Sequence, residues 1–137
     1  MIYFLDTNMV SELARASPDA AVPRQVDAHA GDMALAAVTW YELYYGAGRM
    51  PRGRRRRWLE AFLAEVVAPV FPVVAYETRA AEWHAKERAR CAKAGFTPAL
   101  ADAMIAATAA AHGLILVTRN TNDFAPFDGL PVENWFE

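Results

Sequence analysis

The feature that most constrains the fold of this chain is the alternation of short apolar runs with segments of helical periodicity. The apolar runs span residues 2–5, 34–38, 70–74 and 114–117. Helix-forming segments separate them, and strands that alternate with helices favour a parallel sheet covered on both faces. We therefore predict an α/β fold, a three-layer α/β/α sandwich around a short, mainly parallel sheet.

The helices are predicted from apolar spacing and from start and stop signals. In the last long helix, Thr97 is the expected N-cap, Pro98 the first helical residue, and Gly113 the stop. Pro72 makes residues 70–74 a poor central strand, residues 120–123 are expected to form a turn, and residues 131–135 to add an edge strand. The other predicted helices span residues 8–16, 22–30, 39–47, 54–67 and 76–94.

Length and composition predict one domain. The chain of 137 residues suits a single domain over residues 1–137, and 55% hydrophobic residues with 22% charged residues exclude a disordered chain. The single cysteine, Cys91, excludes an internal disulfide and a cysteine-based zinc cluster. No segment has the pattern of a signal peptide or a membrane span. We expect a soluble, cytoplasmic protein with no membrane contact.

Positive charge is concentrated in one segment of an otherwise acidic chain. The net charge is -2, yet six arginines fall within residues 49–57, here called the arginine segment, with no acidic residue among them. Four of them begin a predicted helix, where cations oppose the helix dipole. The arginine segment is either an ordinary solvated face or a surface that binds a phosphate backbone, with a base stacked on the neighbouring Trp58. The candidate phosphate contacts are Arg52, Arg54, Arg55, Arg56, Arg57 and, after the fourth strand, Arg119.

Four acidic residues are predicted to meet at one edge of the sheet. Asp6 closes the first strand, Glu42 lies in the first turn after the second, and Asp123 follows the fourth. The carboxyl ends of parallel strands share one edge, where sites form. Asp102 is expected in the second turn of an otherwise apolar helix, with no lysine or arginine within one turn. An ionised carboxylate there needs a partner, because burying an unpaired charge is costly.

We interpret these four carboxylates as ligands of Mg²⁺ or Mn²⁺. Oxygen ligands suit both ions, and no Cys/His cluster is present for zinc. Such a centre hydrolyses phosphodiesters, because the ion orients a water, lowers its pKa and neutralises charge on the phosphate. Simpler roles stay open: Asp6 as an N-cap, Glu42 in a capping box with Thr39, and Asp123 as a turn residue.

Four sequence segments follow one another in an order that is informative as a set. They are Leu5-Asp6-Thr7-Asn8 with Ser11-Glu12-Leu13, Thr39-Trp40-Tyr41-Glu42-Leu43 with Gly46, Asp102 to Ala109 with His112-Gly113, and Thr118-Arg119-Asn120 with Asp123-Phe124. Together they resemble a PIN-domain ribonuclease of the VapC toxin type over nearly the whole chain. The resemblance implies a Mg²⁺- or Mn²⁺-dependent endoribonuclease with its acidic centre on Asp6, Glu42, Asp102 and Asp123. It also implies supporting polar contacts from Thr7, Asn8, Ser11, Thr118 and Asn120.

The same resemblance implies partners. Proteins of this family usually form homodimers and are inhibited by a cognate VapB-type antitoxin whose C-terminal tail enters the acidic groove. DNA is then contacted only through the antitoxin, and RNA is the expected substrate. The arginine segment matches none of the family motifs, and we expect it to hold folded RNA. The alternative is a non-catalytic RNA-binding module that uses the arginine segment while the carboxylates are structural.

Other α/β classes with an aspartate after the first strand fit less well. A phosphatase of the haloacid dehalogenase type requires a second aspartate where this chain has Asn8, and a response-regulator receiver requires a paired acid and a late lysine. The only lysines are Lys86 and Lys93, on a polar helix. Neither a Walker A run nor a G-x-G-x-x-G motif is present, so a nucleotide cofactor has no support.

Overall fold

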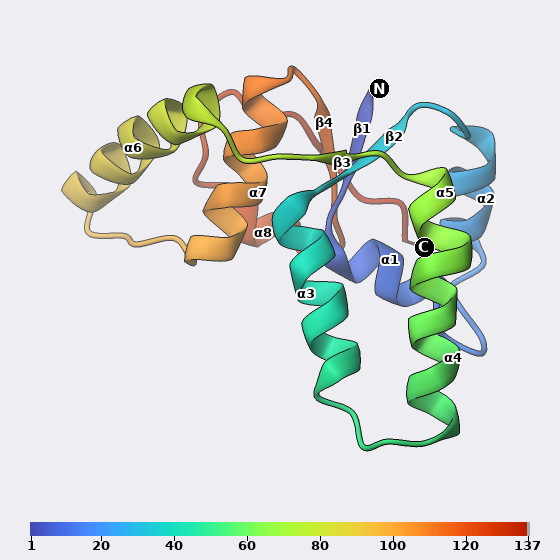
Figure 1. Ribbon diagram of the computed structural model, residues 1–137. Helices are drawn as coiled ribbons and strands as arrows, with labels where there is room; N and C mark the ends of the chain where they lie inside the picture. The colour runs from blue at the N-terminus through green and yellow to red at the C-terminus, as the bar shows by residue number, and fades with distance from the viewer. Residues whose placement is uncertain (137) are drawn as a thin grey trace.

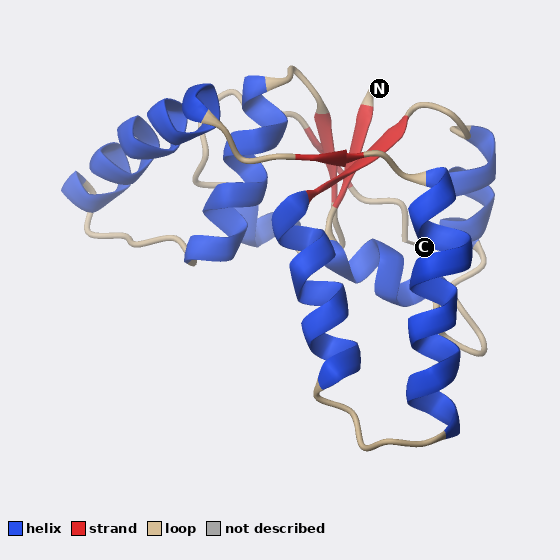
Figure 2. Ribbon diagram, in the orientation of Figure 1, coloured by secondary structure: helices blue, strands red, loops and turns tan. Residues whose placement is uncertain are grey.

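The computed structural model describes residues 1–136 and contains one five-stranded sheet (Figures 1 and 2). Its strand order is β3-β2-β1-β4-β5, and all four neighbouring pairs are parallel. The predicted parallel α/β architecture is therefore confirmed, with the segment after Pro72 at one edge and the predicted C-terminal strand at the other. The strands are β1 (Tyr3–Leu5), β2 (Met33–Ala36), β3 (Val73–Val74), β4 (Ile115–Val117) and β5 (Val132–Glu133).

Helices connect the strands and lie on both faces of the sheet (Figure 1). One predicted helix, residues 54–67, forms and continues to residue 70, with a π-helical turn in its middle. A predicted turn, residues 120–123, instead contains a short helix. The helical elements are α1 (Thr7–Leu13), α2 (Ala21–Ala28), α3 (Ala37–Gly48), α4 (Arg54–Phe62), η1 (Leu63–Val67), α5 (Ala68–Val70), α6 (Thr78–Lys93), α7 (Leu100–Ala111) and α8 (Thr121–Phe124).

Side chains of the strands alternate between two hydrophobic cores. In β1, Leu5 joins the core beneath α1, α2, α3 and α4, whereas Phe4 joins the core beneath α7 and α8. In β2, Leu35 belongs to the first core and Ala34 to the second. This period of two follows from the strand geometry and produces the three layers. Packing on both faces fixes the register of each strand, and hence where its carboxyl end lies.

The start of α3 differs from the prediction. The apolar run continues beyond the strand, so α3 begins at Ala37, with Ala36 as N-cap. A short apolar run cannot by itself distinguish a buried strand from a buried first turn. Thr39 therefore lies inside the helix, fully buried, and its hydroxyl has no hydrogen-bond partner within residues 1–136. The capping box of Thr39 and Glu42 does not form, which leaves the Glu42 carboxylate available for another contact.

The start of α7 also differs. Ala99 is its N-cap and makes no side-chain capping bond, so the predicted N-cap role of Thr97 and helical position of Pro98 are wrong. Asp102 consequently lies in the first turn of α7, not the second. Free backbone N–H groups and the helix dipole favour a carboxylate in a first turn, which is a physical reason for the later start.

The helices α3 and α4 pack side by side and extend away from the sheet as a hairpin (Figure 1). The arginine segment begins at Arg49, the C-cap of α3, and includes the connecting loop and the start of α4. On the other side of the molecule, α6 packs along α7. Within the described residues, no helix is both long enough and apolar enough to span a membrane.

Candidate active site

Asp6 is the centre of the polar site at the carboxyl end of β1. It follows the strand directly and caps α1, because its Oδ1 atom accepts a 2.8 Å hydrogen bond from the backbone N–H of Thr7. The side chain is only 6% exposed. Burial raises the pKa of Asp6, and the nearby Glu42 charge adds to this, although hydrogen bonds oppose both effects. The N-cap role considered from the sequence is confirmed, and it leaves the second oxygen free for other contacts.

The second carboxylate oxygen of Asp6 is held by a network from β4. The hydroxyl of Thr118, which is completely buried, donates to Asp6 Oδ2 over 2.9 Å. Asn8 Nδ2 donates to the same oxygen over 3.1 Å, and the backbone N–H of Asn120 donates to Thr118 Oγ1 over 3.0 Å. The side chain of Asn8 also accepts from the backbone N–H of Arg119. These bonds fix the rotamer of a buried acid across two neighbouring strands.

Glu42 reaches the same edge from α3. The hydroxyl of Thr7 donates to Glu42 Oε1 over 2.5 Å, which joins the N-terminus of α1 to α3. The missing capping box makes this bond possible, because the glutamate side chain is not turned back toward its own helix. Thr7 is thus the residue that places the second acid beside Asp6.

Asp102 and Asp123 complete an acidic region that lacks cationic partners. Burial raises the pKa of Asp102 to about 6, and the charges of Asp6, Asp123 and Glu42 add to the increase. Among residues 1–136, the Asp102 carboxylate has neither a hydrogen bond nor an ion pair. Asp123 is exposed, in the first turn of α8. The four acids that the sequence singled out are therefore close enough to influence one another.

The donors present suit a divalent cation, but they do not form a ready coordination shell. All four are carboxylates, the class of ligand that Mg²⁺ and Mn²⁺ prefer. Across the described part of the chain, no three His, Cys, Asp or Glu side chains are grouped tightly enough to hold one ion. Mutual repulsion of unneutralised carboxylates favours such spacing. Asp123 is exposed, so its side chain has room to rotate, whereas the half-buried Glu42 is held by Thr7.

The raised pKa of Asp102 predicts a distinct pH dependence of stability in metal-free protein. The pKa of Asp102 is about 6 in the folded protein and 3.8 in the unfolded chain, so the folded state keeps the proton to a higher pH. As the pH rises through about 6, ionisation of Asp102 therefore destabilises the folded state. The stabilising effect of Asp102→Asn should therefore grow by roughly 1–2 kcal/mol between pH 4 and pH 7, allowing for partial exposure. Urea unfolding of both proteins at each pH measures this difference. A constant difference would contradict the raised pKa.

A groove beside the acidic region separates α1 from α3 and α4. It has a volume of about 210 Å³, with Thr7 and Glu42 at one end and Arg55 among its lining residues. Ser11, predicted as a supporting residue, is exposed in this lining, not hydrogen-bonded to the acids. Apolar side chains of α1, α3 and the α4 segment cover most of its surface: Val10, Leu43, Leu59, Phe62 and Leu63.

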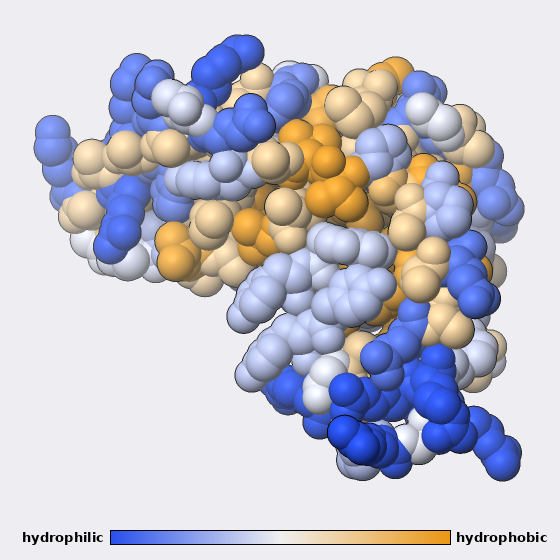
Figure 3. Space-filling view, viewed as in Figure 1, coloured by the Kyte–Doolittle hydropathy of each residue, from blue (hydrophilic) through white to orange (hydrophobic). Residues whose placement is uncertain are grey.

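The predicted arginines fall in two places. Arg119 lies beside the acidic region, with its guanidinium 4.7 Å from the centre of the Phe136 ring. The arginine segment lies at the far end of the α3–α4 hairpin, where Figure 3 shows a strongly hydrophilic surface. The four acids and the arginine segment are thus parts of different surfaces, joined by the groove.

Glu12 and Glu87 are buried acids that received no role from the sequence. Glu12 on α1 is 5% exposed and accepts hydrogen bonds from Arg15 and, over 2.7 Å, from the backbone N–H of Asp19. These contacts lower the pKa of Glu12 and hold the turn that follows α1. The spacing of Asn8 and Glu12, four residues apart on one helix, places both on one face and is the signal that was available.

Comparisons with known proteins agree with this geometry. The model of the PIN domain family matches residues 3–130. The VapC ribonuclease Y4jK of Sinorhizobium fredii is 38% identical over 136 residues, which are 97% of this chain and 96% of that protein. The crystal structure of FitAcB from Neisseria gonorrhoeae shares 32% identity and a TM-score of 0.89 over 97% of both chains.

A third comparison concerns an assembly. A toxin-antitoxin complex from Klebsiella pneumoniae contains a chain that is 26% identical, with a TM-score of 0.73 and 98% of each chain covered. Three findings lead to one assignment. They are the matched family model, the identity along nearly the whole chain, and the parallel sheet with acids at its carboxyl edge. This chain belongs to the PIN-domain family, among the VapC ribonucleases.

Proposed function

We propose that this protein is a metal-dependent endoribonuclease that hydrolyses RNA phosphodiester bonds and acts as the toxin of a toxin–antitoxin pair. The observation that carries the proposal is the state of Asp102. Its pKa is raised to about 6 by burial and by three neighbouring carboxylates, and it has no cationic partner within residues 1–136. A region built with this much unneutralised negative charge needs a cation.

Asp6, Glu42, Asp102 and Asp123 are the residues that would hold Mg²⁺ or Mn²⁺. When bound, such an ion supplies an activated water and neutralises charge on the scissile phosphate. Asp6 is the most constrained ligand, since three hydrogen bonds fix its two oxygens.

The supporting residues act through these carboxylates. Thr7 holds Glu42, while Asn8 and Thr118 hold Asp6. Asn120 acts one step further away, through the Thr118 hydroxyl. Arg119 would contact the phosphate backbone of the RNA at the rim of the site, and Ser11 lines the groove.

The test is cleavage of total cellular RNA by chelator-treated protein. We expect no RNA fragments in the presence of EDTA and discrete fragments after Mg²⁺ or Mn²⁺ is restored. Mapping the ends of these fragments identifies which phosphodiester bonds are cleaved. Isothermal titration of Mn²⁺ into the same protein gives an independent measure of ion binding. Cleavage that persists in EDTA would refute the metal requirement, and absence of any cleavage would favour the non-catalytic binding module.

We also propose that, in the cytoplasm, a VapB-type antitoxin inhibits the enzyme by placing its C-terminal tail in the groove. The apolar lining suits an apolar peptide segment, and the acidic end at Glu42 suits a basic side chain. Repression of the operon would then involve DNA only through the antitoxin. The Klebsiella pneumoniae toxin-antitoxin complex supports the existence of such a partner.

Gly46 provides a test of the groove. It lines the groove within α3, and a Cβ atom added there meets nothing within 4 Å. Gly46→Ala should therefore fold well, with a gain of about 0.5–1 kcal/mol for a helical alanine, and should keep antitoxin affinity. Gly46→Leu should fill part of the groove and weaken antitoxin binding by about tenfold or more. Equal antitoxin affinity of the two variants in calorimetry would place the antitoxin elsewhere.

We further propose a homodimer formed through the outward face of α3. Tyr41 and Tyr45 are 63% and 54% exposed and stack on one another with nearly parallel rings. Together with Tyr44, which is also exposed, they present an aromatic surface on α3. Exposed aromatic clusters are typical of protein interfaces. Sedimentation velocity of wild type and Tyr41→Ser/Tyr45→Ser tests this, with a dimer expected only for wild type.

A further inference from the structure

The arginine segment contains more positive charge than its own structure uses. Arg55 donates to the Ala14 carbonyl over 3.2 Å, and Arg56 bonds both Glu60 and the Met50 carbonyl. These two side chains hold the hairpin together. In contrast, the side chains of Arg52, Arg54 and Arg57 have no hydrogen bond or ion pair with any of residues 1–136. Their charges remain available to an external anion.

The fold does not benefit from this arrangement. Arg54 and Arg57 lie three residues apart in the first turn of α4, where like charges repel and the helix dipole is unfavourable to cations. The N-cap, Gly53, offers no side-chain acceptor, and the first turn contains no acid. A cost in stability without a structural return points to a ligand that neutralises these charges.

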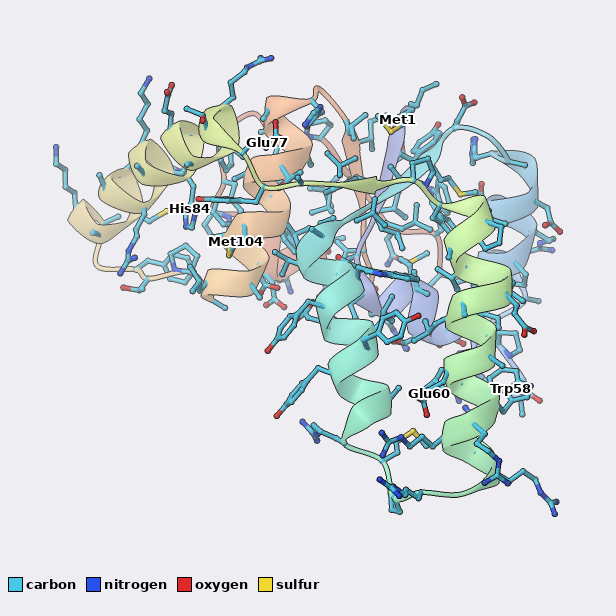
Figure 4. All side chains as sticks on the ribbon, viewed as in Figure 1. Met1, Trp58, Glu60, Glu77, His84 and Met104 are labelled. Atoms are coloured by element: carbon cyan, nitrogen blue, oxygen red, sulfur yellow. The ribbon has the colours of Figure 1, made fainter. Side chains whose placement is uncertain are left out.

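A depression on the outer side of the hairpin collects part of this charge. Its volume is about 520 Å³, and it lies between the end of α1 and the start of α4, lined by Ala14, Arg15, Ala16, Arg54, Arg55 and Trp58. Figure 4 shows Trp58 on the side of α4 that faces away from α3, whereas Glu60 points toward α3. Trp58 is 45% exposed, and the Arg55 guanidinium lies 4.9 Å from the centre of its ring. The depression thus has an apolar floor and three guanidinium groups at its margin.

The depression is connected to the acidic region. Ala14 and Arg55 line both the depression and the groove, and the groove ends at Thr7 and Glu42. An extended chain that leaves the acidic residues along the groove therefore reaches the arginines. An RNA chain carries phosphates at regular intervals, with sugars and bases between them. Its phosphates suit the guanidinium groups, and a sugar or base suits the apolar floor.

We propose that the outer side of the hairpin tip is an anchoring site for the RNA backbone, remote from the acidic centre. Arg54 binds a phosphate within the depression, and Arg57 binds a phosphate beside it, where it lines a neighbouring depression with Arg52. Trp58 with Ala16 contacts a ribose or base between them, whereas Arg15 is held by Glu12 and only borders the depression. Arg55 is a positioning residue, because its contacts with Trp58 and Ala14 keep the depression in shape. This inference rests on the proposed ribonuclease function for its substrate, and it adds a binding subsite outside the acidic residues.

The test measures RNA binding without cleavage. A fluorescein-labelled RNA stem–loop is titrated with the protein in EDTA, and anisotropy gives the dissociation constant at several salt concentrations. The variant Arg54→Gln/Arg57→Gln should bind about tenfold more weakly near 0.1 M salt. The slope of log affinity against log salt should decrease in magnitude by about 1.5, since each lost phosphate contact contributes about 0.7–0.9.

Two matched variants control the experiment. Arg79→Gln/Arg88→Gln removes two exposed arginines of α6, on the other arm of the molecule, and should leave both quantities unchanged. Arg54→Lys/Arg57→Lys keeps the charge and should restore most of the salt slope. Circular dichroism of each variant checks that the helices are intact.

Several results would overturn the anchoring site. One is an unchanged salt slope for Arg54→Gln/Arg57→Gln, and another is an equal loss of RNA affinity in the α6 control variant. A third is normal RNA binding by Arg54→Gln/Arg57→Gln together with lost antitoxin affinity, which would make the hairpin tip a protein-binding surface. The anchoring site and the nuclease proposal can fail separately. If the variant loses RNA binding and the wild type cleaves no RNA, the nuclease proposal alone is refuted. If the wild type cleaves RNA and the variant binds RNA normally, the anchoring site alone is refuted.

Discussion

Asp102→Asn and Asp6→Asn are each expected to reduce metal-dependent RNA cleavage by at least about 100-fold. Asp6→Asn should also lower the free energy of unfolding, because its amide nitrogen cannot accept the hydrogen bonds that reach both Asp6 oxygens. The amide keeps the shape of the side chain and removes the negative charge that would hold the cation. The measurement is the initial rate of cleavage of a labelled RNA at saturating Mn²⁺. Asp123→Asn should have a smaller effect, because Asp123 is exposed and its rotamer is not fixed by any neighbour in the described chain.

The matched control is Asp27→Asn, an exposed aspartate of α2 that should keep the wild-type rate. For Asp102→Asn, the activity loss should coincide with unchanged or higher stability in metal-free protein, because a carboxylate that its neighbours repel has been removed. A destabilised, inactive Asp102→Asn would instead mean that the carboxylate is structural. Full activity of Asp6→Asn would remove the acidic centre from the mechanism.

Thr118→Val is the second change with a large expected effect. Valine has nearly the shape of threonine but cannot donate to Asp6 Oδ2 or accept from the Asn120 backbone, so buried polar groups lose their partners. We expect a loss of about 2–3 kcal/mol in the free energy of unfolding. Mn²⁺ affinity should fall roughly 10- to 100-fold, as is typical when a residue that orients a ligand is removed.

Thermal unfolding and Mn²⁺ calorimetry measure the two effects, and Thr97→Val, at an exposed position before α7, is the control. The loss of a donor also raises the pKa of Asp6 further, so part of the lost Mn²⁺ affinity should return at higher pH. Wild-type stability in Thr118→Val would show that the network around Asp6 contributes little.

Much of the acidic site could be predicted because it depends on strand ends. Asp6 directly follows an apolar run, and any parallel sheet brings such positions to one edge. Asp102 was recognisable as a polar residue in an apolar helix, even though the helix starts later than its apparent capping signals indicate. The contact between Thr7 and Glu42 could not be predicted, because it required α3 to start before Thr39.

The position of the arginine segment shows the same division. The sequence showed the high density of positive charge in this segment and the unfavourable interaction of these cations with the helix dipole. Which arginines are used internally depends on the C-cap of α1, since the carbonyl of Ala14, 41 residues earlier in the chain, accepts a hydrogen bond from Arg55. The depression beside Trp58 likewise combines residues of α4 with the turn after α1, and no local pattern records that proximity.

The sequence by itself determined the alternation of strands and helices, the four acids at the strand ends and in the apolar helix, and the arginine segment. Each is a property of residues close together in the chain, for which periodicity and local charge are sufficient. Only the tertiary structure decided that Thr118 holds Asp6, that Thr7 holds Glu42 and that a groove links the acids to the arginines. These contacts join residues from distant parts of the chain, and packing on both faces of the sheet is what brings them together.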